Sequence, residues 1–438
     1  MKSLRIAMVG TRGIPATYGG IERHVEEIGA RLAQRGHDVT VYARDSYLEK
    51  PLLAHRGVRI RTLATVETKH FEAFLHSGHA AVDGLLRSYD IVHYHALGPG
   101  LFSPVSRFGS TAAVVQTIHG RDDQRGKWGA MAQRALRMGT WLSTWVPHRT
   151  IVVSRDLEED YRDNLGRETT VIPNGAPQAV HRPPNEITQR WGLRGNDYIL
   201  VVGRLVPEKD AGTLIKAFRN VATDCKLVIV GGSSHSGDYV QELELLAAQD
   251  PRVILAGYQY DEVLEELFSN ARLFAQPSIL EGLPLTLLEA AGYALPIIAS
   301  DIGPHQEVLA GIDDEAVLFR TGDAADLTAK LTQMLERFTG QRAQRLADDV
   351  TARYSWDAAT EQVLETYHSA IAARRERGVG RRLSASSDGS RSTIPLRVPQ
   401  QRVGPVSTGS VGLPVSETAE LRLPDAQPSA AESTPIKG

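Results

Sequence analysis

The sequence has 438 residues, of which 42% are hydrophobic and 23% charged, and its net charge is -3. This length suffices for two or three domains with cores of their own, and the near-neutral charge excludes nucleic acid as the main partner. The one cysteine, Cys225, excludes an internal disulfide and a thiolate metal site, which predicts a reducing, cytoplasmic compartment. No apolar run approaches the roughly 18 residues that span a bilayer, and Arg12 ends the first apolar run too early for a signal peptide.

Short β-branched runs alternate with helix-length amphipathic stretches along the first part of the chain. The first strand is predicted at residues 4–9 and is followed by a helix over 22–35, which Gly36 ends. Further strands are predicted at residues 37–42, 58–63, 90–95, 112–119, 150–154 and 171–174. This alternation is typical of βαβ units and a parallel sheet.

The alternation breaks near Pro183 and Pro184 and then starts again. Strands are predicted in this second part at residues 198–203, 226–231, 253–257, 273–277, 296–300 and 316–319. The sequence therefore predicts an α/β fold of two doubly wound, Rossmann-like parallel-sheet domains, joined by a hinge around residues 176–195. Such domains bind ligands at the carboxyl ends of their strands, so two facing edges would form a cleft.

The end of the chain differs from both halves. Periodic apolar residues in 356–373 predict a final packed helix, whereas residues 378–438 contain no Phe, Tyr or Trp and are rich in Ser, Pro, Gly and Ala. A segment of that composition cannot bury enough apolar surface to fold, which predicts a disordered tail. The predicted boundaries are 1–178 and 179–355 for the two domains, 356–377 for the final helix and 378–438 for the tail.

A glycine-rich turn from Gly10 to Gly20 follows the first strand and leads into a helix. Glycines at such a place let backbone N–H groups approach a phosphate, and the helix N-terminus favours the negative charge. The spacing is not G-x-G-x-x-G and the loop is too long for a dinucleotide turn, which disfavours a nicotinamide enzyme. A plain glycine-rich connection is an equally good interpretation of the turn alone.

Two cations follow the first strand of the second domain, in the segment that begins with Gly203. Arg204 offers a planar fork and Lys209 a point charge, and both can reach a diphosphate bound at this sheet edge. A solvated charge pair is the alternative, and the position at the sheet edge favours the binding role.

Two glutamates flank a predicted helix start in the segment Glu281-Gly-Leu-Pro-Leu-Thr-Leu-Leu-Glu289. Pro284 fits the first turn of a helix, and Glu289 lies about one and a half turns further on. The N–H groups of Gly282 and Leu283 would face an anion, while both carboxylates could accept hydrogen bonds from sugar or ribose hydroxyls. The alternative is that the glutamates only offset the helix dipole.

His119 ends an apolar strand of the first domain, where its side chain is delivered to the predicted cleft. A catalytic and a structural role are equally compatible with a lone histidine. His93 and His95 alternate on one strand, but with no Cys or carboxylate beside them they are not expected to be metal ligands. There is no Asp-x-Asp, so no divalent-metal clamp for a diphosphate is predicted.

The ordered set of these motifs resembles the retaining family-4 glycosyltransferases of the two-domain GT-B type. The resemblance covers roughly residues 4–375, and the opening Gly-Thr-Arg-Gly-Ile-Pro-Ala-Thr-Tyr-Gly-Gly is similar to a bacterial subgroup associated with surface polysaccharides. The segments that carry it are Gly19-Gly20-Ile-Glu22, Thr117-Ile-His119, Val152-Val-Ser154, Val171-Ile-Pro-Asn174-Gly175, Gly203-Arg204 with Lys209, and Glu281 with Glu289. The sequence departs from many members in having Thr-Ile-His-Gly where His-Asp is common.

The resemblance implies a role for each matching residue. Arg204 and Lys209 correspond to the diphosphate-binding pair, Glu281 to the residue that holds donor sugar hydroxyls, Glu289 to the ribose ligand, and His119 to the histidine that contacts the transferred sugar. The implied donor-binding positions are Gly19, Gly20, Gly203, Gly232, Tyr258, Gly282, Leu283, Pro284, Leu285 and Glu289. The final helix resembles the one that crosses back onto the first domain.

The implied reaction moves a sugar from a nucleotide-diphosphate-sugar, a substrate and not a cofactor, to a saccharide or lipid-linked saccharide. No metal and no cofactor are expected, because fixed cations and N–H groups stabilise the leaving diphosphate. Three alternatives stay open, namely a nucleotide-sugar epimerase, a sugar phosphorylase and a non-catalytic protein that binds sugar nucleotides.

Residues 121–149 form a basic stretch that contains tryptophans. This stretch is a candidate for contact with a membrane that carries the acceptor. It contains Trp128, Trp141 and Trp145, and six Lys or Arg against two Asp. A helix of this kind can lie on an anionic membrane, here the inner face of the plasma membrane, and the arginines at 374, 375, 377, 381 and 382 would add attraction. An ordinary core-facing helix is the slightly favoured alternative.

Overall fold

The computed structural model describes residues 2–17, 19–47, 50, 52–64, 72–124, 130–232 and 237–385. Residues 1–386 form one compact unit, which contains all of these ranges, and residues 387–438 form another. The predicted tail lies outside the described residues from residue 386 onward.

The first half of the chain builds an eight-stranded sheet in the order β3-β4-β2-β1-β5-β6-β7-β8. Neighbouring strands pair in parallel except β3 and β4, which are antiparallel. The sequence did not predict β3, a two-residue edge strand too short to show a hydrophobic period. The strands are β1 (Arg5–Val9), β2 (Asp38–Arg44), β3 (Ala54–His55), β4 (Val58–Leu63), β5 (Ile91–His95), β6 (Ala113–Ile118), β7 (Arg149–Val152) and β8 (Thr170–Val171).

The second half builds a six-stranded, wholly parallel sheet in the order β11-β10-β9-β12-β13-β14. Its strands are β9 (Tyr198–Val202), β10 (Lys226–Val230), β11 (Val253–Gly257), β12 (Leu273–Gln276), β13 (Ile297–Ser300) and β14 (Ala316–Phe319). In both sheets the chain order reverses beside the first strand, as in doubly wound folds, so the predicted α/β architecture of two such domains is confirmed.

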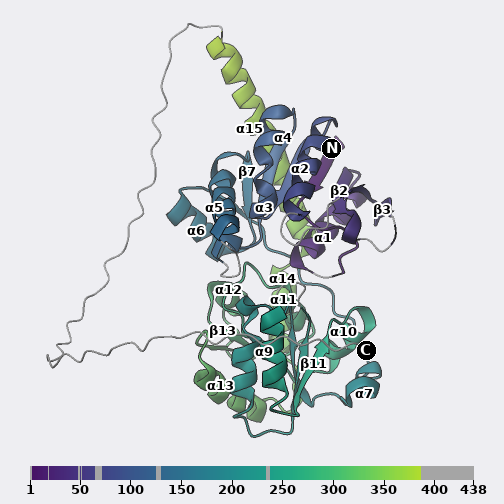
Figure 1. Ribbon diagram of the computed structural model, residues 1–438, viewed down its shortest axis with the longest axis vertical. Helices are drawn as coiled ribbons and strands as arrows, with labels where there is room; N and C mark the ends of the chain where they lie inside the picture. The colour runs from purple at the N-terminus through teal and green to yellow at the C-terminus, as the bar shows by residue number, and fades with distance from the viewer. Residues whose placement is uncertain are drawn as a thin grey trace, which may run out of the picture. The chain divides into compact units, whose positions relative to one another are not determined.

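Helices connect the strands and cover the faces of each sheet, purple and blue for the first sheet and teal and green for the second (Figure 1). Those of the first half are α1 (Gly20–Gln34), α2 (Glu72–Leu85), α3 (Leu97–Gly100), α4 (Ser103–Gly109), α5 (Ala130–Trp145) and α6 (Arg155–Leu165). Those that follow are α7 (Glu186–Trp191), α8 (Ala211–Phe218), α9 (Gly237–Ala247), α10 (Asp261–Asn270), α11 (Leu285–Gly292), α12 (Gly303–Leu309), α13 (Ala324–Arg337), α14 (Gln344–Arg353) and α15 (Trp356–Ala385).

Several strands end one or more residues before their predicted ends. The loops that carry the candidate site residues are correspondingly longer. β6 ends at Ile118 and β12 at Gln276, so His119 and Glu281 lie in the loops at the carboxyl ends of the sheets. β8 covers Thr170–Val171 instead of 171–174, because Pro173 has no N–H with which to continue the ladder.

Helix α15 packs against the core of the first sheet. Its buried side chains include Trp356, Val363, Leu364 and Tyr367, which join a cluster formed by the first strands and α1. The hydroxyl of Tyr367 lies 2.8 Å from Nδ1 of His93, a buried residue of β5. The helix continues to Ala385, beyond residue 377 where the sequence analysis ended it.

Candidate active site

A cavity of about 230 Å³ lies at the carboxyl ends of the strands and is lined by both halves of the chain. The first half contributes Gly19, Gly20 and Arg23 from the turn after β1 and the start of α1. Residues of the second half that line it include Gly203, Arg204, Tyr258, Leu285 and Glu289. The structure therefore brings together candidate residues that are up to 270 positions apart in the sequence.

The glycine-rich turn is held in place by carboxylates of the helix that follows it. The backbone N–H of Arg12 donates to Glu22 (3.1 Å), and that of Ala16 donates to Glu26 (2.7 Å). Gly19 precedes the first residue of α1 with a φ of +107°, a conformation that strongly favours glycine. These contacts keep the backbone at Gly19 and the N-terminus of α1 at the cavity wall.

Lys209 and Glu281 form an ion pair in the second half of the site. The Oε1 atom of Glu281 also accepts a hydrogen bond from the amide of Gln276 at 3.0 Å. Burial disfavours the ionised form of Glu281, but the Lys209 ammonium outweighs burial and holds the pKa of this carboxyl below its ordinary value. Glu281 is thus held as a carboxylate, the form that accepts hydrogen bonds from hydroxyl groups.

Arg204 and Lys209 approach the same small pocket beside the main cavity. This pocket is also lined by Gly203, Gln276 and Ser278, at the carboxyl ends of β9 and β12. Because Arg204 lines the main cavity as well, the two predicted cations lie around one edge of the site. This placement agrees with the expectation that both can reach one anionic group.

The loops after β10 and β11 meet at the far wall of the cavity. Gly232 lies under the ring of Tyr258, where a Cβ would come within 2.6 Å of the aromatic carbons. The rings of Tyr258 and Tyr260 are stacked, with their centroids 6.1 Å apart and an interplanar angle of 9°. Both tyrosines line the cavity, so this wall offers flat aromatic faces to a ligand.

The loop before α11 touches the first half of the chain at His119. A Cβ on Gly282 would overlap the carbonyl oxygen of His119, so the two loops meet backbone to backbone. Leu283, by contrast, is buried in the hydrophobic core, and its side chain packs away from the cavity. Pro284 precedes α11 as its N-cap residue, whereas the sequence analysis placed it in the first helical turn.

Glu289 lies on α11 and faces the main cavity. Burial raises the pKa of Glu289 to about 7, and the positive charge of Arg23 opposes that rise. Its state of protonation therefore changes near neutral pH.

His119 lies partly exposed at the end of β6, and its Nε2 lies 3.3 Å from Nδ1 of His95. Burial and the neighbouring His24 and His93 hold the pKa of His119 well below its ordinary value. The imidazole is therefore neutral at neutral pH. The predicted histidine thus has a histidine partner, His95.

Sequence reasoning did not find several residues of the site. Arg23, Gln259, Tyr260, Thr286 and Trp356 line the main cavity. Gln276 bonds Glu281 from the end of β12, a position that carries a functional side chain in many parallel sheets. Two signals could have identified residues of this group. Gln276 stands at the carboxyl end of a strand, and Arg23 stands in the first turn of the helix that follows the glycine-rich turn.

Each half of the chain matches a known protein family. Residues 18–179 match the family described as Glycosyltransferase Family 4, and residues 185–348 match the family described as Glycosyl transferases group 1. The two matched segments meet within the predicted hinge. Together they contain all of the candidate site residues.

Known proteins resemble the chain over most of its length. Alpha-maltose-1-phosphate synthase from Mycolicibacterium smegmatis is 26% identical over 399 residues, which are 84% of this chain and 100% of that protein. The structure of sucrose-phosphate synthase from Thermosynechococcus elongatus superposes with a TM-score of 0.74 at 22% identity, covering 84% of this chain and 100% of the other. That of Anabaena HepE in complex with UDP and glucose superposes with a TM-score of 0.69 at 20% identity, with the same coverage. The chain is therefore a glycosyltransferase, and it belongs to the family-4 enzymes of the GT-B type.

Proposed function

We propose that the protein transfers a sugar, with retention of the anomeric configuration, from a nucleotide-diphosphate-sugar to a saccharide or lipid-linked saccharide. The observation that carries this proposal is the group formed by Arg204, Lys209 and Glu281 at one edge of the cavity. The two cations match the negative charge of a diphosphate. The ionised carboxylate beside them matches the hydroxyl groups of a sugar attached to that diphosphate.

The size and lining of the cavity support a nucleotide-sugar as the donor. The tyrosine pair at 258 and 260 offers stacking to a base, and Glu289 offers a carboxylate to ribose hydroxyls. Arg204 and Lys209 would then meet the diphosphate, and Glu281 the sugar hydroxyls. The complex of the related fold HepE with UDP and glucose agrees with a donor of this class.

Charge stabilisation is the main chemical contribution of the site. Breaking the bond between the anomeric carbon and the diphosphate leaves negative charge on phosphate oxygens. Lys209 is held by Glu281, and the contacts of Glu22 and Glu26 hold the turn before α1. Together with Arg204, these groups would stabilise that charge. Each such cation lowers the barrier by about 2–4 kcal/mol, if it acts like other preorganised donors to a developing anion.

Retention is proposed from the resemblance to retaining enzymes, and the state of Glu281 favours a front-face displacement as its route. Glu281 is held by Lys209 and Gln276, so it is positioned to accept hydroxyl hydrogen bonds and not to attack carbon. In a front-face displacement the leaving phosphate takes the proton of the acceptor hydroxyl. Two domains that close over the donor would exclude water and limit hydrolysis.

The transfer is proposed to need no metal ion. Mg²⁺ prefers oxygen ligands, and within the described parts of the chain the one cluster of three potential ligands consists of histidines. Arg204 and Lys209 supply the positive charge that a metal would otherwise bring to the diphosphate.

A role in bacterial polysaccharide or glycoconjugate synthesis is proposed from the glycine-rich turn. Its sequence from Gly10 to Gly20 is similar to that of enzymes associated with surface polysaccharides. The turn lies at the wall of the cavity, where it contributes Ala16, Thr17, Gly19 and Gly20. Acceptors of that pathway class are saccharides, free or linked to a lipid.

A lipid-linked acceptor would be met at a membrane surface, and α5 is suited to such a surface. Met131, Met138, Trp141 and Trp145 recur at helical spacing and are 54–77% exposed. The opposite face of α5 is buried, so the helix packs on the core and presents an apolar stripe at the same time. In the described parts of the chain no helix is long and apolar enough to cross a membrane.

The charge contribution to this surface is smaller than the sequence suggested. Arg121 forms ion pairs with Asp123 and Asp160, and Arg149 donates to Ser369. Arg134 and Arg137 remain as exposed cations on α5 itself. Trp128, Arg125, Lys127 and the side chains of Arg377, Arg381 and Arg382 lie outside the described residues.

A donor panel tests the proposal. Nucleoside diphosphate release is measured for UDP-, GDP-, ADP- and dTDP-sugars in the presence of EDTA, with and without saccharide and lipid-linked acceptors. Acceptor-dependent release together with a glycosylated product supports transfer. An isomerised donor would indicate an epimerase, release of a sugar phosphate a phosphorylase, and binding without turnover a non-catalytic protein; each would contradict the proposal.

A further inference from the structure

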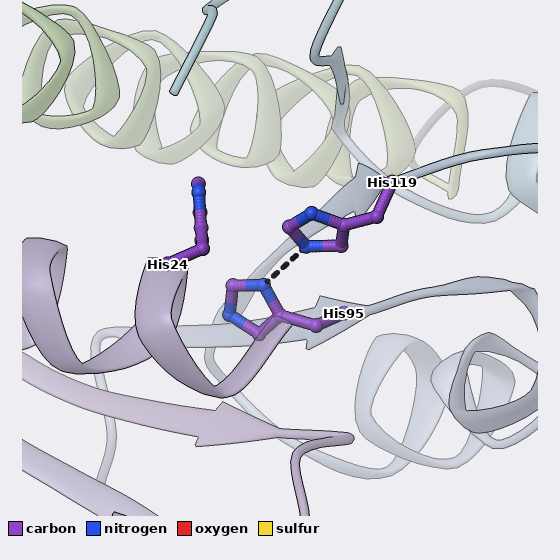
Figure 2. Close-up of side chains that lie close together, drawn as sticks. All are labelled: His24, His95 and His119. Atoms are coloured by element: carbon purple, nitrogen blue, oxygen red, sulfur yellow. Dashed lines mark hydrogen bonds between the residues drawn. The ribbon is translucent and has the colours of Figure 1, made fainter. Parts of the chain in front are cut away.

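Three histidines from separate elements meet at the carboxyl edge of the first sheet. His24 lies on α1, His95 is the last residue of β5, and His119 follows β6 (Figure 2). One ring nitrogen of each residue lies within 4.8 Å of those of the other two. In the sequence His95 is close only to His93 on the same strand, so the pattern does not predict this group.

The hydrogen bonds leave part of this cluster without partners. His24 Nδ1 lies 2.7 Å from Oδ1 of Asn174, and because that oxygen only accepts, Nδ1 carries the proton and Nε2 the lone pair. Nε2 of His24 is buried and has no hydrogen-bond partner among the described residues. Nε2 of His95 is buried without a partner as well, and it carries the ring proton when Nδ1 of that ring acts as a ligand. A buried nitrogen lone pair without a donor is a vacant ligand position.

The spacing of the other two rings fits a common ion. His95 Nδ1 and His119 Nε2 lie 3.3 Å apart, joined by the hydrogen bond that is dashed in Figure 2. Two nitrogens at about 2.0–2.1 Å from one tetrahedral zinc ion are separated by about 3.4 Å. An ion at this place would take the position of the shared proton, which moves to the other nitrogen of its ring. The His24 ring would have to move toward the ion, because the three candidate ligand atoms lie up to 4.8 Å apart.

The surroundings favour ligation over protonation. Burial lowers the pKa of His24 to about 4, and it holds the pKa values of His95 and His119 well below the ordinary value. Protons therefore do not compete for these nitrogens at neutral pH. The contact of His24 with Asn174 is of the kind that orients a metal-binding imidazole from its outer side.

We propose that His24, His95 and His119 form a binding site for a transition-metal dication such as Zn²⁺, and that the bound ion inhibits sugar transfer. An all-imidazole set selects Zn²⁺, Co²⁺ or Ni²⁺ over Mg²⁺. His119 is partly exposed, which leaves a route for the ion and an open fourth ligand position. Ligation withdraws the His119 ring from the donor sugar; this inhibition, unlike the binding itself, rests on the proposed function.

The binding experiment is a Co²⁺ titration of the chelator-treated full-length protein, followed by visible absorption. We expect one tetrahedral Co²⁺ per chain in the wild type, displaced by Zn²⁺. In His24→Ala the affinity should fall by more than the ~10–100-fold typical of losing an outer-shell partner. His76→Ala is the matched control, because His76 is also buried with an unpartnered Nε2 but lies on α2, and it should bind Co²⁺ as the wild type does.

A second variant keeps all three ligands. Asn174→Ala removes only the hydrogen bond to His24, and it should weaken Co²⁺ binding by about 10–100-fold. Thermal unfolding without metal identifies any variant that fails to fold. Octahedral Co²⁺ spectra, no binding, or equal binding by His24→Ala and the wild type would overturn the site.

The activity experiment is separate from the binding experiment. Zn²⁺ should inhibit wild-type transfer, EDTA should reverse the inhibition, and Mg²⁺ should have no effect. The residual activity of His24→Ala should be insensitive to the Zn²⁺ concentrations that inhibit the wild type. Tetrahedral Co²⁺ bound without loss of activity would overturn the inhibition, whereas a lack of transfer by metal-free protein would overturn the proposed function and leave the site intact.

Discussion

At the residue scale, the ion pair of Lys209 and Glu281 organises one edge of the candidate site. Their side chains are 20% and 10% exposed, so the pair is shielded from solvent on most sides. Each partner holds the other in its ionised state, which is the state that binds phosphate and sugar hydroxyls respectively. Losing either partner would leave the other as a poorly solvated charge.

Removing either member of this pair should strongly impair transfer. Lys209→Ala and Glu281→Ala each remove a contact to the proposed transition state, and we expect kcat to fall by roughly 30- to 1,000-fold, equivalent to about 2–4 kcal/mol. Steady-state kinetics with the best donor measures the loss. Lys216→Ala, which removes an exposed lysine of α8, is the control and should keep wild-type activity. Near-normal turnover by either pair variant would refute the assignment.

Glu289 should make donor binding depend on pH near neutrality. Because its pKa is raised to about 7 by burial, Glu289 is a carboxylate above that pH and a neutral acid below it. The carboxylate is the stronger acceptor for ribose hydroxyls, so the donor KM should rise as the pH falls through about 7. In Glu289→Gln, whose amide does not titrate, this inflection should vanish. An unchanged profile in that variant would assign the inflection to another group.

The positions of the charged residues around the cavity were largely predictable from the sequence, whereas their roles stay predictions. Arg204, Lys209 and Glu281 lie in the loops that follow β9 and β12, and charged side chains at that edge indicate a binding role. Arg23 and Gln276 were not found, because a helix turn and a strand end contain many polar residues without a function. The approach of His24 to His95 depends on the packing of α1 against the sheet, which local sequence does not encode.

At the element scale, the loop before α11 and the loop after β6 approach each other more closely than a side chain would allow. Gly282 contacts the carbonyl of His119 and the Cα of Gly120, and this close packing positions Glu281 relative to the first half. Only glycine fits where two backbones meet in this way.

A side chain at this contact should impair transfer. Gly282→Ala places a Cβ against the His119 carbonyl, and overpacking of this kind costs about 1–3 kcal/mol. We expect kcat/KM to fall by at least about tenfold, because the loops must separate. Gly84→Ala on α2, where a Cβ would meet nothing within 4 Å, is the matched control. Equal activity in the two variants would show that the contact is not needed.

Helix α5 should carry the proposed membrane contact. The double variant Trp141→Ala/Trp145→Ala removes two exposed aromatic side chains, and binding to vesicles with anionic lipid at low salt should fall several-fold. Co-sedimentation measures the binding. Phe108→Ala, which removes an exposed aromatic residue of α4, is a comparison for non-specific apolar contact. If the wild-type protein does not bind the anionic vesicles, the proposed membrane contact is contradicted.

Element types were predictable, whereas the exact ends were not. The hydrophobic period identifies buried strands such as β9 and β10, but a two-residue edge strand like β3 contains no period. Helix α1 begins at Gly20, two residues before its predicted start, because Gly19 provides the cap conformation.

At the scale of the whole molecule, the last helix ties the end of the folded chain back to the first sheet. Gly175, after β8, lies against Trp356, and the backbone N–H of Ala176 donates to the carbonyl of Tyr354 (2.8 Å). The segments that leave and re-enter the first half therefore contact each other. These contacts make the crossing point a natural place for a hinge between the two sheets.

A substitution of Tyr367 tests how much the packing of α15 on the first sheet contributes to the stability of the protein. Tyr367→Phe removes the hydroxyl that lies 2.8 Å from Nδ1 of His93 and leaves a buried nitrogen without its partner. We expect the free energy of unfolding to fall by about 1–3 kcal/mol. Chemical denaturation measures the change. No loss of stability in Tyr367→Phe would show that the contact is replaceable.

The two-sheet architecture was predictable because alternating strands and helices have few compatible topologies. The meeting of Gly282 with His119 was not, since it depends on how the two sheets pack. The resemblance to a family predicts the two-domain fold, which the family matches of both halves confirm, and it predicts nothing of this contact.

The anomeric configuration of the product tests sugar transfer in this cleft most directly. A proton NMR time course, with the best donor and acceptor and with EDTA present, follows the donor, the product and the released nucleoside diphosphate together. The product should have the anomeric configuration of the donor and should appear in step with the diphosphate. An inverted product, or diphosphate released without a glycosylated product, would contradict retaining transfer by Arg204, Lys209 and Glu281.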